Sequence, residues 1–293
     1  SRVKLGEVGD RIVAPPLPRG AGTITSIPAA DGIIRRPTHV EGSNHTETVS
    51  AELLRPLAAI RRTIVIVGSH DNSLDVLADQ LKAGHADLTL SSSHVGSMGG
   101  LMAIKRGVCH LAGTHLLDTE DGTYNISYLK KYLPDTAVKL IHLVQRDQGL
   151  IVKPGNPKEI RGIEDLGRKD LSFINRQVGS GTRILLDYKL NQLGIKADAI
   201  NGYQNEEFTH MAVAVSVLSG SEDTGLGIYA AAKALSLDFI PVVTEQYDLV
   251  VHQEYFESEA VQILLDIINS PVFKQRVEAL GGYSTKNTGT VIL

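Results

Sequence analysis

The stretch "RTIVIVGSHDNSLDVLADQLKAG", residues 62–84, decides the fold class of most of the chain. Its first half is an apolar run that ends at Gly68, as expected for a buried β-strand. Its second half has apolar side chains at helical spacing and ends at Gly84, which is typical of an amphipathic helix with a glycine stop. The apolar positions of that helix are Leu74, Leu77, Ala78 and Leu81. A strand followed by such a helix is the unit of a parallel sheet with helices on both faces.

The same order recurs over residues 61–293, where "LSFIN" precedes "RILLDYKLNQLG" and "TGLGI" precedes "YAAAKALSL". Two long β runs, "HLVQRDQGLIV" (142–152) and "EQYDLVVHQ" (245–253), interrupt this order. They predict a hinge that the chain crosses twice, and therefore a two-lobed α/β fold with a ligand between the lobes. The predicted bounds are about 61–146 and 247–293 for the first lobe and about 149–245 for the second. A single continuous α/β domain is the alternative.

The first 56 residues have a different pattern, with short β-branched runs separated by Pro, Gly and Asp-Gly turns. Asp31-Gly32 suits a tight hairpin turn, and "TETVSAELL" (46–54) alternates like a strand. This pattern predicts a small all-β module over residues 1–56. About 55 residues form a marginal core alone, so we expect the module to pack on the larger part of the chain.

The composition argues against several classes of protein. The 293 residues carry a net charge of -4, which argues against a general nucleic-acid surface. No run reaches the roughly 18 apolar residues of a membrane span, and no signal peptide is visible, so we expect a cytoplasmic protein. Cys109 is the only cysteine, which excludes an intrachain disulfide and favours a small core residue.

The loop "NRQVGSGTR", residues 175–183, follows one of the predicted strands and contains the start of a helix. Loops at the carboxyl ends of parallel strands form the ligand crevice, and the free N–H groups of a helix start attract anions. Its candidate ligand-binding residues are Ser180, Gly181, Thr182 and Arg183. The loop matches neither the P-loop nor the dinucleotide-binding pattern. Helix capping alone is the alternative interpretation.

Three loops after strands of the first lobe, at residues 68–73, 91–97 and 113–118, carry hydroxyl groups and one histidine each. The strand ends converge, so these side chains are predicted to face one region. No carboxylate or cysteine has metal-ligand spacing and no GxSxG elbow is present, so donation to an oxyanion is favoured over metal binding or hydrolysis. Loop histidines whose nitrogens bond only to backbone groups are an equal alternative. The candidates outside the 175–183 loop are Ser69, His70, Ser92, Ser93, Ser97, Thr114, His115 and, at a helix start in the second lobe, His210.

These residues resemble known families. From about residue 61 the chain resembles the type II periplasmic-binding-protein fold, and "GLIVKPGNPKEIRGIEDL" with "NRQVGSGTR" is similar to molybdate- and tungstate-binding proteins. "NRQVGSGTRILLDYKL", "EEFTHMAVAV" and "GLGIYAAAKAL" resemble the binding-protein-like domain fused to MoeA-type molybdopterin biosynthesis proteins. The first 56 residues resemble the C-terminal β-barrel domain of MoeA, with its "RGAG" loop and "ADGI".

The resemblance implies a cytoplasmic protein of molybdenum cofactor biosynthesis that binds molybdate or tungstate as a ligand, with no covalent cofactor. It also implies upstream MoeA catalytic domains that are absent here, a parent that acts as a molybdopterin molybdenumtransferase, and a homodimer. The chain alone would then have no turnover. Two alternatives remain open. The chain could be an accessory part of the molybdenum-insertion enzyme, or an effector domain for an organic molecule such as a pterin.

Overall fold

The computed structural model describes residues 1–17, 30–35 and 47–293. Its first part contains two small antiparallel sheets. One is formed by β1 (Arg2–Val3), β4 (Gly32–Ile34) and β5 (Ala51–Leu53), and the other by β2 (Gly6–Val8) and β3 (Arg11–Val13). These strands agree with the predicted β content, while a closed barrel stays a prediction and the "RGAG" loop lies outside the described residues.

Asp31 and Gly32 do not form the predicted tight turn. Gly32 begins β4, and the buried Asp31 carboxylate accepts hydrogen bonds from the Leu5 N–H (3.0 Å) and the Arg55 guanidinium (2.8 Å). These contacts fix Asp31 inside the module instead of at a hairpin tip. Helix α2 (Leu57–Arg61) connects the module to the rest of the chain, and Val8 packs in the core of the first lobe.

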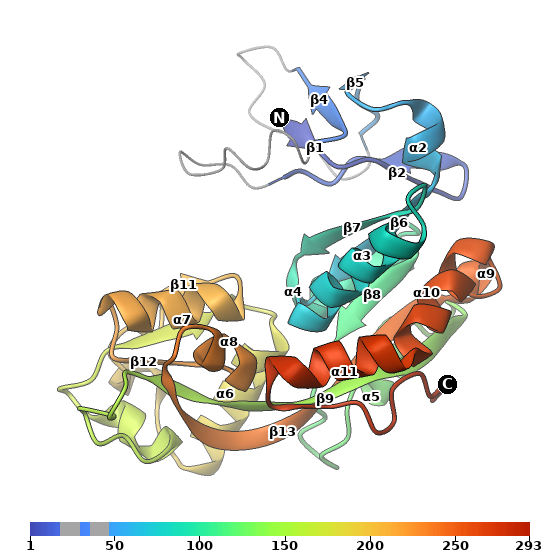
Figure 1. The fold of residues 1–293 in the computed structure, drawn as a ribbon. Helices are drawn as coiled ribbons and strands as arrows, with labels where there is room; N and C mark the ends of the chain where they lie inside the picture. Colours follow the sequence, from blue (N-terminus) through green and yellow to red (C-terminus); the bar gives the residue numbers. More distant parts are fainter. Residues whose placement is uncertain (18–29, 36–46) are drawn as a thin grey trace.

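The remaining strands form one nine-stranded sheet in the order β11-β10-β12-β9-β13-β8-β6-β7, with β14 paired to β9 (Figure 1). The first lobe contains β6 (Thr63–Gly68), β7 (Thr89–His94) and β8 (Leu111–Thr114), which are parallel. The second contains β10 (Phe173–Arg176), β11 (Glu206–Glu207) and β12 (Thr224–Ile228), also parallel.

Two long antiparallel strands, β9 (Val138–Val152) and β13 (Asp238–His252), run through both lobes (Figure 1). Their pairing is interrupted between Pro241 and Val243 and between Tyr247 and Asp248. The two-lobed α/β fold with a doubly crossed connection is therefore confirmed.

Helices cover both faces of the sheet in each lobe, as the apolar strands predict. In the first lobe these are α3 (Asn72–Gly84), α10 (Glu259–Asn269) and α11 (Pro271–Leu280) on one face, and α4 (Gly96–Lys105) and α5 (Ile126–Tyr132) on the other. In the second lobe, α6 (Gly181–Gln192) with η1 (Ile163–Gly167) covers one face, and α7 (His210–Ser219) with α8 (Tyr229–Ala234) covers the other. The shorter elements are η2 (Ala197–Ala199), α9 (Gln253–Phe256) and β14 (Tyr283–Ser284).

Cys109 is fully buried against α4, as predicted for a core residue. In the described parts of the chain, no helix is both long and apolar enough to span a membrane.

Candidate functional site

Two helices from opposite lobes begin side by side at the junction between the lobes. Gly96, the first residue of α4, has a φ of 79°, and a Cβ added there would lie 3.0 Å from the carbonyl oxygen of Gly179. Gly181, the first residue of α6, lies against His115 of the first lobe. The glycine-rich loop of residues 175–183 thus meets the first lobe and brings two helix N-termini to one place.

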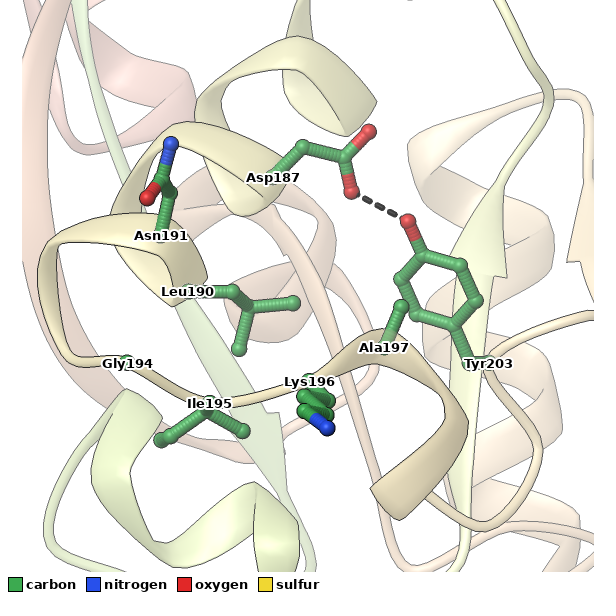
Figure 2. A pocket seen from close by; sticks show the side chains of 8 residues that line it. All are labelled: Asp187, Leu190, Asn191, Gly194, Ile195, Lys196, Ala197 and Tyr203. Atoms are coloured by element: carbon green, nitrogen blue, oxygen red, sulfur yellow. Dashed lines mark hydrogen bonds between the residues drawn. The ribbon is translucent and has the colours of Figure 1, made fainter.

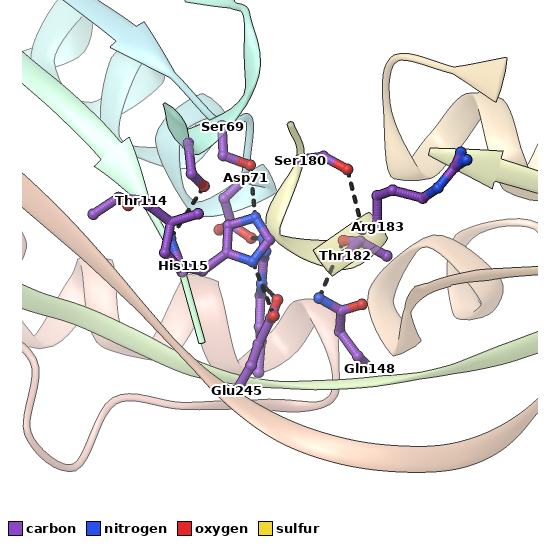
Figure 3. Close-up of polar contacts among 12 residues, drawn as sticks. Ser69, Asp71, Thr114, His115, Gln148, Ser180, Thr182, Arg183 and Glu245 are labelled. Carbon is purple, nitrogen blue, oxygen red and sulfur yellow. Dashed lines mark hydrogen bonds and ion pairs between the residues drawn. The ribbon is translucent and has the colours of Figure 1, made fainter. Parts of the chain in front are cut away.

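His115 stands at the centre of this junction (Figure 3). Its Nε2 lies 2.8 Å from Ser69 Oγ, and its Nδ1 lies 2.9 Å from a Glu245 carboxylate oxygen. Its backbone N–H donates to Ser97 Oγ at 3.2 Å. Burial lowers the pKa of His115, although Glu245 acts in the opposite direction. The imidazole is therefore neutral at pH 7 and is held in one orientation.

A buried charge network lies beneath His115. The Arg146 guanidinium donates to Glu245 and to Asp71, each at 2.5 Å, and the Tyr283 hydroxyl donates to Asp71 at 2.8 Å. Burial alone would raise the pKa of Glu245, but Arg146 and His115 hold it at about 2. Two carboxylates thus surround one guanidinium, so the charge of Arg146 is already compensated by the protein.

Arg176, the last residue of β10, is buried without such compensation. Its Nε donates to the side-chain oxygen of Gln177 and to the carbonyl oxygen of Glu207, both at 3.2 Å. Its Nη2 donates to the carbonyl oxygen of Phe208 at 3.0 Å. All three partners are neutral oxygen atoms. Burial and the neighbouring Arg146 lower the pKa of Arg176 to about 9, so the guanidinium remains charged at pH 7.

Buried polar atoms without a partner gather around Arg176. Among the described residues, eight buried side-chain polar atoms have no hydrogen-bond partner, and five belong to this region. These five are Arg146 Nη2, Gln148 Oε1, Arg176 Nη1, His210 Nδ1 and His210 Nε2. Such atoms are rare in folded proteins, because an unsatisfied buried donor or acceptor costs about 1–3 kcal/mol. Their concentration indicates the place of a polar ligand.

His210 is the first residue of α7 and is 2% exposed. Burial, and then the nearby Arg176 and Arg146 charges, lower the pKa of His210 well below its ordinary value. Gln148, in β9, donates from its amide nitrogen to Thr182 Oγ1 at 3.2 Å, a contact between the connecting strand and α6 (Figure 3).

The structure brings together most of the residues predicted from the sequence. Ser180 caps α6 by accepting from the Arg183 N–H at 3.2 Å, and Thr114 donates to the Asn125 side-chain oxygen at 3.0 Å. The predicted residues that are buried at the junction are Ser69, Ser97, Thr114, His115, Ser180, Gly181, Thr182 and His210.

Four predicted residues lie differently. Ser92 and Ser93 are inside β7, at the edge of the sheet, and Ser92 is exposed, because the strand continues to His94. His70 Nε2 lies 3.1 Å from a carboxylate oxygen of the exposed Asp75, and its ring is tilted by 44° to the ring of His94, 4.2 Å away between centres. It remains close enough to the buried His210 to contribute to the lowered pKa of that group. Arg183 extends away from His115 in Figure 3.

The Arg183 guanidinium lies 3.9 Å from the centre of the Tyr203 ring and 3.3 Å from a Glu206 carboxylate oxygen. It ties α6 to its own lobe, so the structure does not place it among the groups that face the junction.

Sequence reasoning missed Arg146, Gln148, Asp71 and Glu245 as site residues, and Arg176 of the 175–183 loop was only a less certain candidate. A signal was present for the two arginines and for Gln148. Arg176 directly follows an apolar strand, and Arg146 and Gln148 interrupt the otherwise apolar run of residues 142–152. Charged or amide side chains at positions that the pattern buries need a partner, which is a reason to expect a site.

A separate surface pocket of about 370 Å³ lies at the far end of α6 (Figure 2). Its lining residues are Asp187, Leu190, Asn191, Gly194, Ile195, Lys196, Ala197 and Tyr203. The Tyr203 hydroxyl donates to Asp187, and none of the buried unpartnered atoms belongs to this pocket. Across residues 1–17, 30–35 and 47–293, no group of three or more His, Cys, Asp or Glu side chains is arranged to hold a metal ion.

Comparisons with known proteins agree with this architecture. The uncharacterized protein YvgK of Bacillus subtilis is 39% identical over 232 residues, which are 79% of this chain and 74% of that protein. A putative phosphate ABC transporter substrate-binding protein with bound phosphate from Clostridium perfringens has a TM-score of 0.56 at 16% identity, covering 74% of this chain and 97% of that one. The tungstate ABC transporter structure from Geobacter sulfurreducens has a TM-score of 0.53 at 14% identity, covering 74% and 98%.

The two solved structures show the likeness of the fold. Residues 78–269, which include β9, β13 and both helix starts at the junction, match the family model described as the PBP superfamily domain. The chain therefore belongs to the PBP superfamily.

Proposed function

We propose that this protein binds a small oxyanion at the junction between its two lobes. The observation that carries the proposal is Arg176, a buried cation whose three hydrogen-bond partners are neutral oxygen atoms and whose Nη1 has no partner. A buried charge without a counter-charge is costly, and a bound anion would supply that counter-charge. Asp71 and Glu245 cannot do so, because Arg146 already engages them. The Glu207 carboxylate acts on Arg176 only at long range, since the direct contact is with the Glu207 carbonyl oxygen.

Neutral groups complete the site. The N-termini of α4 and α6 direct unpaired backbone N–H groups and the positive ends of their helix dipoles toward the junction. The imidazole of His210 offers one more donor. Preorganised N–H groups of this kind share the charge of a tetrahedral anion. Similarity in fold to a putative phosphate ABC transporter substrate-binding protein with bound phosphate and to a tungstate ABC transporter supports the same class of ligand.

Calorimetric titration tests the proposal with four anions, namely molybdate, tungstate, phosphate and sulfate. A ligand at about 100 times its dissociation constant should raise the free energy of unfolding by about 2.7 kcal/mol. Arg176→Met should abolish or strongly weaken binding, whereas Arg161→Met, at an exposed arginine of the same lobe, should leave it unchanged. If the protein binds none of the four anions, the proposal is wrong.

The quoted motifs support a competing, narrower function, in which the ligand is molybdate or tungstate. The chain would then capture that anion in the cytoplasm for a MoeA-type molybdenum-insertion enzyme. Its test is to add the chain, charged with molybdate, to a MoeA-type enzyme with its molybdopterin substrate and to follow metal insertion. Faster insertion at low molybdate is expected, and an unchanged rate would contradict delivery.

A further inference from the structure

The unpartnered atoms at the junction include acceptors as well as donors. Arg146 Nη2 and Arg176 Nη1 can only donate. Gln148 Oε1 can only accept. His210 is neutral, so its two free nitrogens are one donor and one acceptor. A ligand that offers only acceptor atoms would therefore leave two buried acceptors unsatisfied.

The orientation of the Gln148 amide is fixed by its surroundings. Its nitrogen donates to Thr182 Oγ1 at 3.2 Å, and the amide also contacts the Glu245 carboxylate, helping to lower the pKa of that group. An ionised carboxylate only accepts hydrogen bonds, so the contact with Glu245 requires the amide nitrogen on that side, where the Thr182 hydroxyl accepts from it. The oxygen is consequently the end of the amide that has no partner.

Gln148 and His210 lie at the same edge of the second lobe. Gln148 pairs with Ile228 at the carboxyl end of β12. A Cβ added at the preceding residue, Gly227, would lie 3.7 Å from His210 Nδ1. Arg176 ends β10, the strand next to β12, so the free acceptors and the uncompensated cation share this edge.

We infer that the ligand is an oxyanion that keeps a proton at neutral pH, such as phosphate or arsenate, and that Gln148 Oε1 accepts the hydrogen bond of its O–H group. This inference rests on the proposed function. Sulfate, molybdate and tungstate are fully deprotonated at neutral pH and offer acceptors only. They would leave the Gln148 oxygen unsatisfied, so Gln148 selects against the two metal oxyanions that the sequence resemblance implies.

The test is calorimetric titration of the full chain with phosphate, arsenate, sulfate and molybdate at pH 7. Phosphate and arsenate should bind at least about tenfold more tightly than sulfate and molybdate, since an unsatisfied buried acceptor is worth about that factor. Gln148→Met keeps the side-chain length and removes the acceptor, so the ratio of the sulfate to the phosphate dissociation constant should fall to near one. Gln192→Met, at an exposed glutamine of α6, is the matched control and should keep the wild-type ratio.

The outcomes separate the two proposals. If the wild-type protein binds none of the anions, oxyanion binding itself fails. If it binds sulfate or molybdate as tightly as phosphate, oxyanion binding stands and the inference about the proton is overturned. A preference for phosphate that survives Gln148→Met would overturn the role of Gln148. If Gln148→Met fails to fold, the ratio of the sulfate to the phosphate dissociation constant in the wild-type protein still decides the class of ligand.

Discussion

Gly181 of the second lobe stands directly against His115 of the first. A Cβ at Gly181 would lie 2.5 Å from both Nδ1 and the carbonyl oxygen of His115. Real Cβ atoms do not approach other atoms so closely, and the carbonyl oxygen belongs to the backbone, which moves only at a cost. The absence of a side chain at Gly181 is therefore what allows the lobes to meet, with the start of α6 beside the imidazole that Glu245 and Ser69 orient.

Gly181→Ala should hold the lobes apart at this point. Overpacking typically costs about 1–3 kcal/mol, so the anion dissociation constant should rise by a factor of about 5 to 150. Gly84→Ala is the control, because a Cβ at Gly84 meets nothing within 4 Å. Calorimetry gives the affinity and thermal unfolding gives the stability. An unchanged affinity in the Gly181→Ala variant would show that the contact with His115 is not needed for binding.

The same substitution at the two buried arginines should lower the stability of the fold to different extents. Arg146→Met leaves Asp71 and Glu245 as uncompensated buried carboxylates, so we expect a loss of about 3–5 kcal/mol in the free energy of unfolding. Arg176→Met removes a buried cation that has no carboxylate partner among its contacts, together with three hydrogen bonds to neutral oxygen atoms. The anion-free protein should therefore lose less stability than the Arg146→Met variant does. Urea unfolding of both variants without added anion measures the contrast, and equal losses would contradict it.

Cys109 should not react with thiol reagents in the folded protein. Burial raises the pKa of its thiol to about 12, so almost no nucleophilic thiolate exists at pH 7 to 8. We expect labelling by a chromogenic disulfide reagent only after unfolding in urea, at a rate that follows the unfolding transition. Rapid stoichiometric labelling of the native protein would show that the helix packed over Cys109 opens readily.

The periodicity of apolar residues in the sequence was sufficient to predict most of the strands and helices of the fold. Apolar runs followed by amphipathic helices predicted the covered sheet, and the two long β runs predicted β9 and β13, since strand and helix periods are local properties. The run "ADLTLSSS", residues 86–93, also predicts a strand, which the structure confirms through Ser93. The same serines were assigned to the ligand loop after that strand as well. Pairing with β6 keeps Ser92 and Ser93 in the sheet, and local sequence preference does not show where such pairing ends.

The candidate site was predicted in part for a similar reason. Loops at strand ends identified Ser180 and His115, because the topology of a parallel sheet brings such loops together. The charge balance could not be derived from the sequence. Arg146 and Arg176 are both arginines in or next to apolar runs, so the sequence does not distinguish them. Only the three-dimensional structure shows that Arg146 contacts two carboxylates and that Arg176 contacts only neutral oxygen atoms.

Glu245 should make part of the stability depend on pH in the acid range. Its pKa is about 2 in the folded protein, against an ordinary value of 4.5, because Arg146 and His115 outweigh the effect of burial. A carboxylate with a lowered pKa stabilises the fold fully above its ordinary pKa, and this contribution is lost as the pH falls from about 4.5 toward 2. Urea midpoints at pH 6 and pH 3 should therefore differ less in Glu245→Gln, which is already less stable at pH 6, than in the wild-type protein. Glu257→Gln, at an exposed position, is the control, and its urea midpoint should change between pH 6 and pH 3 as much as that of the wild-type protein. If the midpoint of Glu245→Gln changes by that same amount, Glu245 ionises normally in the fold.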